Sequence, residues 1–146
     1  MDSNERDRLK GVNKDLIYAK AIEIKESQPI EVLQKYSGVC GIYGMWIDDK
    51  LVYIGSSKDV LLRWCFHQTH TFYDFGQHDY KEKKYEILRE AKSAGCRVSF
   101  NLLEKCKKGA LRILEVRYIK QYKPVLNQEF TNNRLDDNIT LKDILG

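Results

Sequence analysis

Four residues whose side chains can act on a phosphodiester lie close together in the sequence: two tyrosines, an arginine and a histidine. Tyr43 ends a Gly-Ile-Tyr triplet at residues 41–43, and Tyr53 opens a Tyr-Ile-Gly triplet at residues 53–55. Arg63 and His67 follow, four residues apart, a spacing that places both on one face of a helix. A guanidinium binds phosphate oxygens in pairs, and tyrosine and histidine can transfer protons. Together these residues predict a site that cuts phosphodiester bonds.

Two β-like segments, residues 39–47 and 51–55, are expected to position the tyrosines. The turn-forming residues 48–50 join them, and this spacing predicts a hairpin that brings Tyr43 and Tyr53 near each other. Residues 56–59 offer side chains that cap a helix, which predicts that a helix begins at residue 60 and carries Arg63 and His67.

The helix expected over residues 60–71 has two stripes. Its apolar stripe consists of Val60, Leu61, Trp64 and Cys65. The opposite stripe consists of Arg63, His67 and His70, at steps of four and three. We expect the second stripe to face away from the core, with His70 as a solvated residue.

The remaining elements follow from periodicity and from helix-stop signals. The pattern predicts one or two helices over residues 13–36, the first capped by Asn13 or Asp15 and the second opened by Pro29. It further predicts a loop at 72–79, a helix at 80–94 ended by Gly95, a third strand at 97–105, and a helix at 109–122 ended by Pro124. Beyond residue 127 we expect a poorly ordered tail or a short terminal helix.

Glu115 falls inside the apolar stripe expected for the last of these helices. That stripe consists of Leu111, Leu114, Tyr118 and Tyr122. An unpaired carboxylate on an apolar face costs several kcal/mol, so Glu115 must meet a cation, a metal ion or strong donors. A structural salt bridge is one interpretation, and the neighbouring tyrosines and arginine favour a metal ligand.

Length and composition indicate one compact domain with tails. The chain has 146 residues, 42% of them apolar, with no stretch long and apolar enough for a membrane span and a charged N-terminus unlike a signal peptide. A cytoplasmic location is expected. The four cysteines are scattered, which favours free thiols over a zinc site that would use Cys65 and His67.

Positive charge is concentrated in the middle of the chain. Residues 38–127 hold 16 Lys and Arg against 10 Asp and Glu, whereas residues 1–37 balance at 7 and 7 and residues 128–146 have 2 and 4. A phosphate backbone is a partner that suits this distribution. Two lysine groups are candidates for phosphate contact, although each is also explained as a solvated face: Lys81, Lys83 and Lys84, and Lys105, Lys107 and Lys108.

The residues over about 38–127 resemble the GIY-YIG nuclease superfamily. The resemblance rests on both triplets with Ser56 after the second, on Arg63 and His67, on Glu115 in a Glu-Val-Arg-Tyr-Ile stretch, and on a closing Lys-Pro-Val-Leu-Asn that ends at Asn127. It implies a small α/β (α+β) domain, a three-stranded antiparallel sheet flanked by helices. It also implies hydrolytic DNA cleavage with one divalent ion, leaving 5′-phosphate and 3′-hydroxyl ends. Residues 1–37 would then be a helical extension and 128–146 a polar tail.

The resemblance also implies roles for individual residues. Tyr43, Tyr53, Arg63, His67 and Glu115 would be catalytic, with Glu115 as the ligand of Mg²⁺ or Mn²⁺. Substrate contacts are expected from Lys58, His78 and Asn127. The pattern around the arginine is most similar to phage homing-endonuclease catalytic domains, but only nineteen residues follow Asn127, so long-site recognition is not expected.

Several alternatives stay open at this point. Either Tyr43 or His67 could be the general base, since a free phenol has a pKa of about 10 and an imidazole one of about 6.5. A non-catalytic nucleic-acid-binding or partner-binding module of the same fold is the second function, and an RNA-directed nuclease or toxin ranks lower because no aromatic RNA-stacking platform is evident. A homodimer would suit an enzyme that cuts both strands.

Overall fold

The computed structural model describes residues 3–127 and 139–146, with side chains described from residue 13 onward. The elements, in chain order, are α1 (Ser3–Glu26), α2 (Ile30–Tyr36), β1 (Gly41–Ile47), β2 (Lys50–Ser57), α3 (Val60–Phe72), the 3₁₀ helix η1 (His78–Lys81), α4 (Lys83–Ser93), β3 (Val98–Lys105), the 3₁₀ helix η2 (Lys108–Ala110), α5 (Leu111–Tyr122) and α6 (Leu141–Leu145). The tail expected over 128–138 lies outside the described residues.

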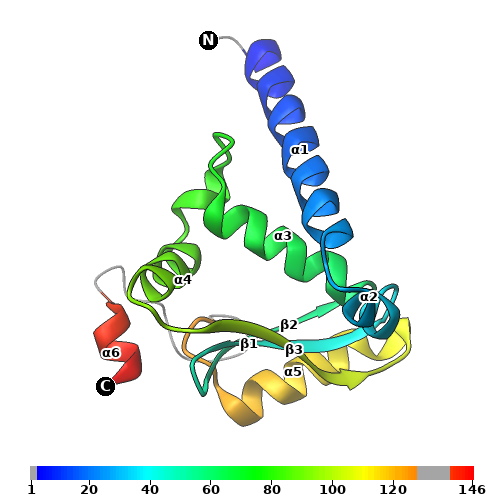
Figure 1. The fold of residues 1–146 in the computed structure, drawn as a ribbon, viewed down its shortest axis with the longest axis vertical. Helices are drawn as coiled ribbons and strands as arrows, with labels where there is room; N and C mark the ends of the chain where they lie inside the picture. Colours follow the sequence, from blue (N-terminus) through cyan, green and yellow to red (C-terminus); the bar gives the residue numbers. More distant parts are fainter. Residues whose placement is uncertain (1–2, 128–138) are drawn as a thin grey trace.

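The fold is a three-stranded antiparallel sheet between helices, which confirms the predicted fold class. The strand order is β2-β1-β3, so β1 is the central strand. Helix α5 lies against one face of the sheet, and α3 and α4 lie on the other (Figure 1). None of the helices in the described ranges is long and apolar enough to cross a membrane.

The hairpin register explains why both triplets contain a glycine. Tyr43 pairs with Gly55 across β1 and β2, and a Cβ at residue 55 would lie 2.4 Å from the Tyr43 hydroxyl oxygen. A Cβ at Gly41 would lie 2.3 Å from the backbone oxygen of Glu104 on β3. The first glycine therefore lets two strands approach, and the second lets the Tyr43 ring lie against β2.

Side chains alternate between the two faces of β1 and build a core on each side. Met45 and Ile47 are fully buried in the larger cluster, together with residues of α3 and α4, whereas Ile42 joins Ile54 and Ile119 of α5 in a smaller one. Each such side chain contributes about 1.5–3 kcal/mol through burial. The central strand is thus held from both faces, which fixes the position of Tyr43.

The N-terminal helix is longer than the sequence predicts. Helix α1 begins at Ser3 and passes through Asn13 and Asp15, so neither residue caps it. It packs against α3 and buries Ile17 and Ala21. The helix continues through Gly11. A glycine inside a helix costs roughly 1 kcal/mol relative to alanine, which does not end a helix on its own.

The other differences concern helix ends. The segment 78–81 forms a 3₁₀ turn, so α4 begins at Lys83 rather than at residue 80. Gly95 follows the end of α4, as predicted, and has a φ of +84°. Tyr122 was expected to point inward but is 53% exposed, and Ile119 is the fully buried residue of α5. Tyr122 instead stacks on Tyr118, with ring centroids 6.1 Å apart.

A short capped helix lies at residues 141–145, in agreement with one of the two alternatives expected beyond residue 127. Thr140 and Asp143 form a reciprocal capping box at the start of α6, and Ile144 is buried. The Lys50 ammonium donates a hydrogen bond to the backbone oxygen of Ile144, which attaches α6 to the start of β2.

Candidate active site

Tyr43 of β1 and His67 of α3 meet in the core. The Tyr43 hydroxyl oxygen lies 2.6 Å from Nε2 of His67, and neither side chain is more than 1% exposed. Asp59 caps α3 by accepting a hydrogen bond from the Leu62 amide, which confirms the predicted capping and sets where the helix begins. The hairpin and the cap together bring these two side chains into contact.

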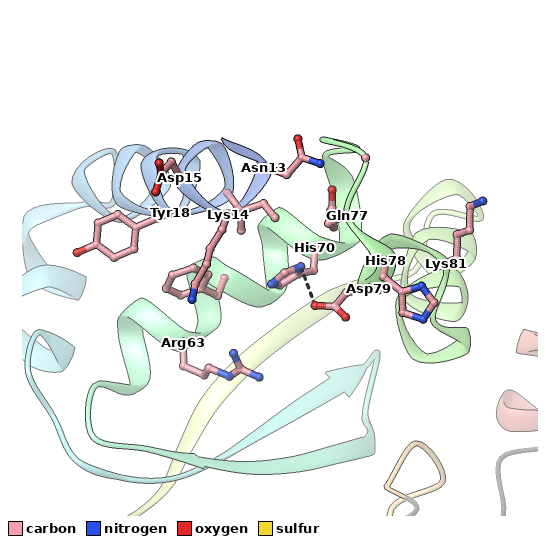
Figure 2. Close-up of a pocket in the computed structure, with 13 residues that line it drawn as sticks. Asn13, Lys14, Asp15, Tyr18, Arg63, His70, Gln77, His78, Asp79 and Lys81 are labelled. Carbon is pink, nitrogen blue, oxygen red and sulfur yellow. Dashed lines mark ion pairs between the residues drawn. The ribbon is translucent and has the colours of Figure 1, made fainter. Parts of the chain in front are cut away.

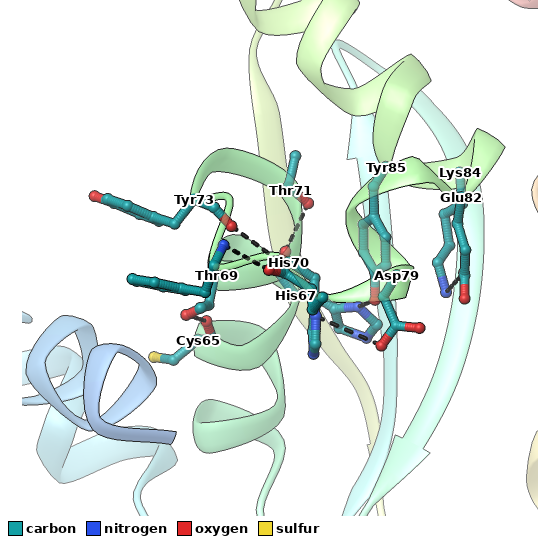
Figure 3. Close-up of polar contacts among 12 residues, drawn as sticks. Cys65, His67, Thr69, His70, Thr71, Tyr73, Asp79, Glu82, Lys84 and Tyr85 are labelled. Carbon is teal, nitrogen blue, oxygen red and sulfur yellow. Dashed lines mark hydrogen bonds and ion pairs between the residues drawn. The ribbon is translucent and has the colours of Figure 1, made fainter. Parts of the chain in front are cut away.

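Tyr85 completes the group and was missed by the sequence analysis. Its hydroxyl lies 3.0 Å from Nδ1 of His67 (Figure 3). Since Tyr43 lies at Nε2, both imidazole nitrogens face a tyrosine. Tyr85 lies on α4, eighteen residues from His67, and is 3% exposed. A tyrosine on the apolar side of a helix reads as core packing, so no signal in the sequence pointed to this contact.

His67 is neutral in this environment. Burial lowers the pKa of the imidazole well below its usual value, and the positive charges of Arg63 and Lys84 and the neighbouring His70 act in the same direction. A neutral imidazole has one donor and one acceptor nitrogen. Since each nitrogen faces a hydroxyl, one tyrosine donates to His67 and the other accepts from it, according to the tautomer.

Tyr43 keeps its proton in the free protein. Burial raises the pKa of its phenol, the nearby Tyr53 raises it further, and the charge and hydrogen bonding of Arg63 oppose this rise. Arg63 therefore lies beside the hydroxyl and favours its deprotonated form. The structure thus brings Tyr43, His67 and Arg63 together, as the sequence predicted.

Tyr53 lies against the same group but is only partly buried. Its ring centroid is 6.5 Å from that of Tyr43 and 5.7 Å from that of His67. The Lys84 ammonium lies 4.7 Å from the ring centroids of both Tyr53 and Tyr85. A cation over two aromatic rings is favourable by about 0.5–1 kcal/mol each at partly exposed sites.

The expectation that the stripe on α3 faces away from the core is wrong. His67 is fully buried, and the His70 side chain is 12% exposed. His70 stacks between Phe66 and Tyr85, with ring centroids at 6.4 and 5.6 Å. A wheel drawn for one helix cannot show that α1 and α4 cover its polar side, which is the physical reason for the error.

Glu115 lies on the opposite face of the sheet, on α5. It accepts a 2.5 Å hydrogen bond from the Ser56 hydroxyl, and within the described residues it forms no ion pair. Ser56 directly follows Gly55, against which the Tyr43 ring lies. The two parts of the candidate site therefore approach each other at the end of β2.

The oxygen ligands at Glu115 fit a hard divalent cation. A carboxylate and a hydroxyl are the ligand types that Mg²⁺ prefers, and this ion usually keeps several waters. Among residues 13–127 and 139–146 no group of three or more His, Cys, Asp or Glu side chains could jointly hold a metal ion. Waters and phosphate oxygens would have to complete the coordination.

The zinc alternative does not suit the geometry. Both nitrogens of His67 already face tyrosine hydroxyls. Burial raises the pKa of the Cys65 thiol to about 11, which disfavours the thiolate that zinc requires. All four cysteines are free, as predicted.

The three expected substrate contacts have different surroundings. Asn127 is buried and bonds both to the amide and to the oxygen of Ile54, at 2.8 and 2.9 Å, so it joins the segment after α5 to β2. Lys58 is exposed, and the neighbouring Lys108 lowers the pKa of its ammonium. His78 is exposed on η1 and lines the same cavity as Arg63.

No family model matches the chain, and no curated protein matches it. Among solved structures, a mutant of bacteriophage T4 EndoII is similar, with 21% sequence identity and a TM-score of 0.46, over 66% of this chain and 96% of that chain.

Proposed function

We propose that this chain is a metal-dependent DNA endonuclease of the GIY-YIG type. The observation that carries the proposal is the buried 2.6 Å contact between Tyr43 and His67, with Arg63 beside the same hydroxyl. A proton-transferring pair next to a permanent cation is what phosphodiester hydrolysis requires. The order and spacing of both triplets, of the arginine and of Glu115 support the family assignment.

Arg63 binds the scissile phosphate in this proposal. Its guanidinium holds two phosphate oxygens and stabilises the charge that develops on them during attack. Water attacks phosphorus, the bond to the 3′ oxygen breaks, and the products are a 5′-phosphate and a 3′-hydroxyl end.

The Tyr43–His67 pair removes the proton from the attacking water. Tyr43 accepts that proton as its own hydroxyl proton passes to Nε2 of His67, so the phenolate need not accumulate despite the raised pKa of Tyr43. This assignment combines the two alternatives for the general base. Tyr85 orients the imidazole through Nδ1 and is a positioning residue.

Glu115 would hold the divalent cation, with the Ser56 hydroxyl as a neighbouring oxygen. When bound, Mg²⁺ or Mn²⁺ supplies Lewis-acid stabilisation of the departing 3′ oxygen. Lys58 and Lys108, both exposed near the end of β2, would contact the DNA backbone without reading its sequence. The nuclease unit would span about residues 38–127, and a homodimer would allow both strands to be cut.

Nicking of supercoiled plasmid tests the proposal. The wild-type chain should nick DNA in Mg²⁺ and not in EDTA. Glu115→Gln should lower the nicking rate at least about 100-fold, which is the loss typical when a group that stabilises charge in the transition state is removed. Glu104→Gln is the matched control, because Glu104 also accepts a hydrogen bond from a hydroxyl, that of Tyr118, and it should retain activity.

Other results would overturn the proposal. Absence of cleavage of supercoiled, branched and single-stranded DNA, with binding retained, would establish the non-catalytic binding module instead. Cleavage that survives both Glu115→Gln and Arg63→Ala would show that the centre is assigned wrongly.

A further inference from the structure

A cavity of about 840 Å³ opens between α1, α3 and the segment that connects α3 to α4. Residues 13–18 and 76–81 contribute walls, and Arg63 projects toward it from α3 (Figure 2). This volume lies within the range of roughly 300–1,000 Å³ that is usual for small-molecule pockets. Since Arg63 also lies beside the Tyr43 hydroxyl, a ligand in the cavity would adjoin the candidate active site.

The wall formed by residues 76–81 is held in place by Arg89 of α4. Its guanidinium donates hydrogen bonds to the backbone oxygens of Thr71 and Tyr80, at 3.0 and 2.6 Å. It also lies 4.0 Å from the centroid of the Tyr80 ring. The cavity is therefore bounded by a segment with fixed contacts at both ends.

One side of the cavity is aromatic. Phe66 and His70 both line it, and their rings are stacked at 24°. Burial lowers the pKa of His70. Asp79 opposes this shift by raising the pKa, whereas the positive charges of Arg63 and Lys84 lower it further. The ring is therefore neutral near pH 7. Phe66 and Tyr85 cover the two faces of the His70 ring, so Phe66 is the ring that offers a stacking surface to a nucleobase.

Two polar atoms at this wall lie close together but too far apart to form a hydrogen bond with each other. Within the described part of the chain, Nδ1 of His70 is buried without a hydrogen-bond partner, and Oδ2 of Asp79 lies 3.6 Å from it (Figure 2). A buried unpaired nitrogen is costly unless a ligand satisfies it. An imidazole N–H beside a carboxylate oxygen complements a ring nitrogen beside an exocyclic amino group, the edge that several bases present.

We propose that this cavity receives one nucleotide extruded from the DNA next to the scissile phosphate. The base packs against the Phe66 ring, and its exocyclic amino group donates to Asp79. Lys14 and Lys81, both exposed lining residues, lie where neighbouring phosphates would pass. This inference rests on the proposed nuclease function, because a base enters the cavity when the adjoining phosphate is at Arg63.

Titration of the full chain with mononucleotides, followed by NMR of the imidazole and aromatic side chains, tests the site without using cleavage. The resonances of His70 and Phe66 should move with dAMP or dCMP and stay unchanged with deoxyribose 5-phosphate. Thymidine monophosphate lacks the exocyclic amino group and should bind at least about tenfold more weakly.

A matched pair of variants adds the second measurement. Phe66→Leu should weaken dAMP binding about tenfold or more, because it removes a stacking face. Phe75→Leu changes an equally half-buried aromatic residue of the same region that does not line the cavity, and it should bind like the wild type. The same Phe66 variant should lower the rate of DNA nicking.

Each remaining outcome overturns the inference in a distinguishable way. Equal responses to deoxyribose 5-phosphate would mean a phosphate site only, and no response would mean no nucleotide site. If Phe66→Leu weakens mononucleotide binding but leaves nicking unchanged, the cavity binds free nucleotides rather than an extruded base. Failure of the titration with nicking intact contradicts this inference alone, whereas loss of both contradicts the proposed function as well.

Discussion

The hydroxyl of Tyr43 and Nε2 of His67, 2.6 Å apart in the core, connect the first strand triplet to the helix that follows the hairpin. Tyr85 holds the same imidazole through its other nitrogen at 3.0 Å. Because both ring nitrogens have partners, the orientation of His67 is fixed before any substrate arrives. Preorganisation of this kind lowers the cost of proton transfer during reaction.

Replacing Tyr43 with Phe should separate chemistry from folding. The variant keeps the ring that packs against Gly55 but loses the hydroxyl and leaves Nε2 of His67 without that partner. We expect the nicking rate to fall at least about 100-fold and the free energy of unfolding to fall by about 1–3 kcal/mol. Single-turnover nicking and urea unfolding measure the two effects, and a near-wild-type rate would remove Tyr43 from the mechanism.

Tyr85→Phe tests a positioning role. Loss of its hydroxyl removes the hydrogen bond at Nδ1 of His67 and should lower the nicking rate by about tenfold or less, in line with a lost neutral hydrogen bond of about 0.5–1.5 kcal/mol. The acidic limb of the pH–rate profile should move to lower pH, because the charged imidazole loses an acceptor. Tyr36→Phe, which alters a tyrosine bonded to Asn101, is the control. A profile identical to that of the wild type would make Tyr85 a packing residue only.

Gly55→Ala should destabilise the fold through the Tyr43 ring. A Cβ at this position would lie 2.4 Å from the hydroxyl oxygen and 2.5 Å from Cζ of Tyr43, so the ring must move. Overpacking of this kind costs about 1–3 kcal/mol. Gly109→Ala meets nothing within 4 Å and should stay within about 0.5 kcal/mol of the wild type. Equal stability of the two variants in urea unfolding would contradict the hairpin geometry.

The buried histidine predicts a pH dependence of stability with a definite sign. The pKa of His67 is lowered in the folded state, so the unfolded state binds more protons below a pH of about 6.5, its usual value. Stability should therefore fall as pH drops below that value, by up to about 1.4 kcal/mol per pH unit for this group. His70, whose pKa is also lowered by burial, adds a contribution of the same sign.

Urea unfolding at several pH values between 7 and 5 measures this slope. His67→Gln should flatten it relative to the wild type, and the difference between the two curves isolates the contribution of His67 from that of the carboxylates. An unchanged slope in the variant would mean that His67 titrates alike in the folded and unfolded states.

The sequence predicts local structure well where that structure depends on residues close together in the chain. The hairpin, the cap at Asp59 and the stop at Gly95 follow from alternation, capping chemistry and a positive φ, and all three are present. The meeting of Tyr43, His67 and Arg63 also follows, because the hairpin and the helix after it are adjacent in the chain.

Features that depend on which elements cover one another could not be predicted in this way. His70 carries a polar side chain at a position that looks solvated until α1 and α4 are placed over it. Tyr85 contacts His67 only because α4 packs on α3. The cavity itself needs α1, which begins at Ser3, ten residues before the cap predicted at Asn13.

A double-variant comparison tests the central claim that residues on two faces of the sheet form one nuclease centre. Single-turnover nicking would be measured for Tyr43→Phe, for Glu115→Gln and for the variant with both changes. Residues that act as a unit are grossly non-additive, so the double variant should be no slower than the slower single variant. Rates that multiply, or a single variant with wild-type activity, would contradict the account.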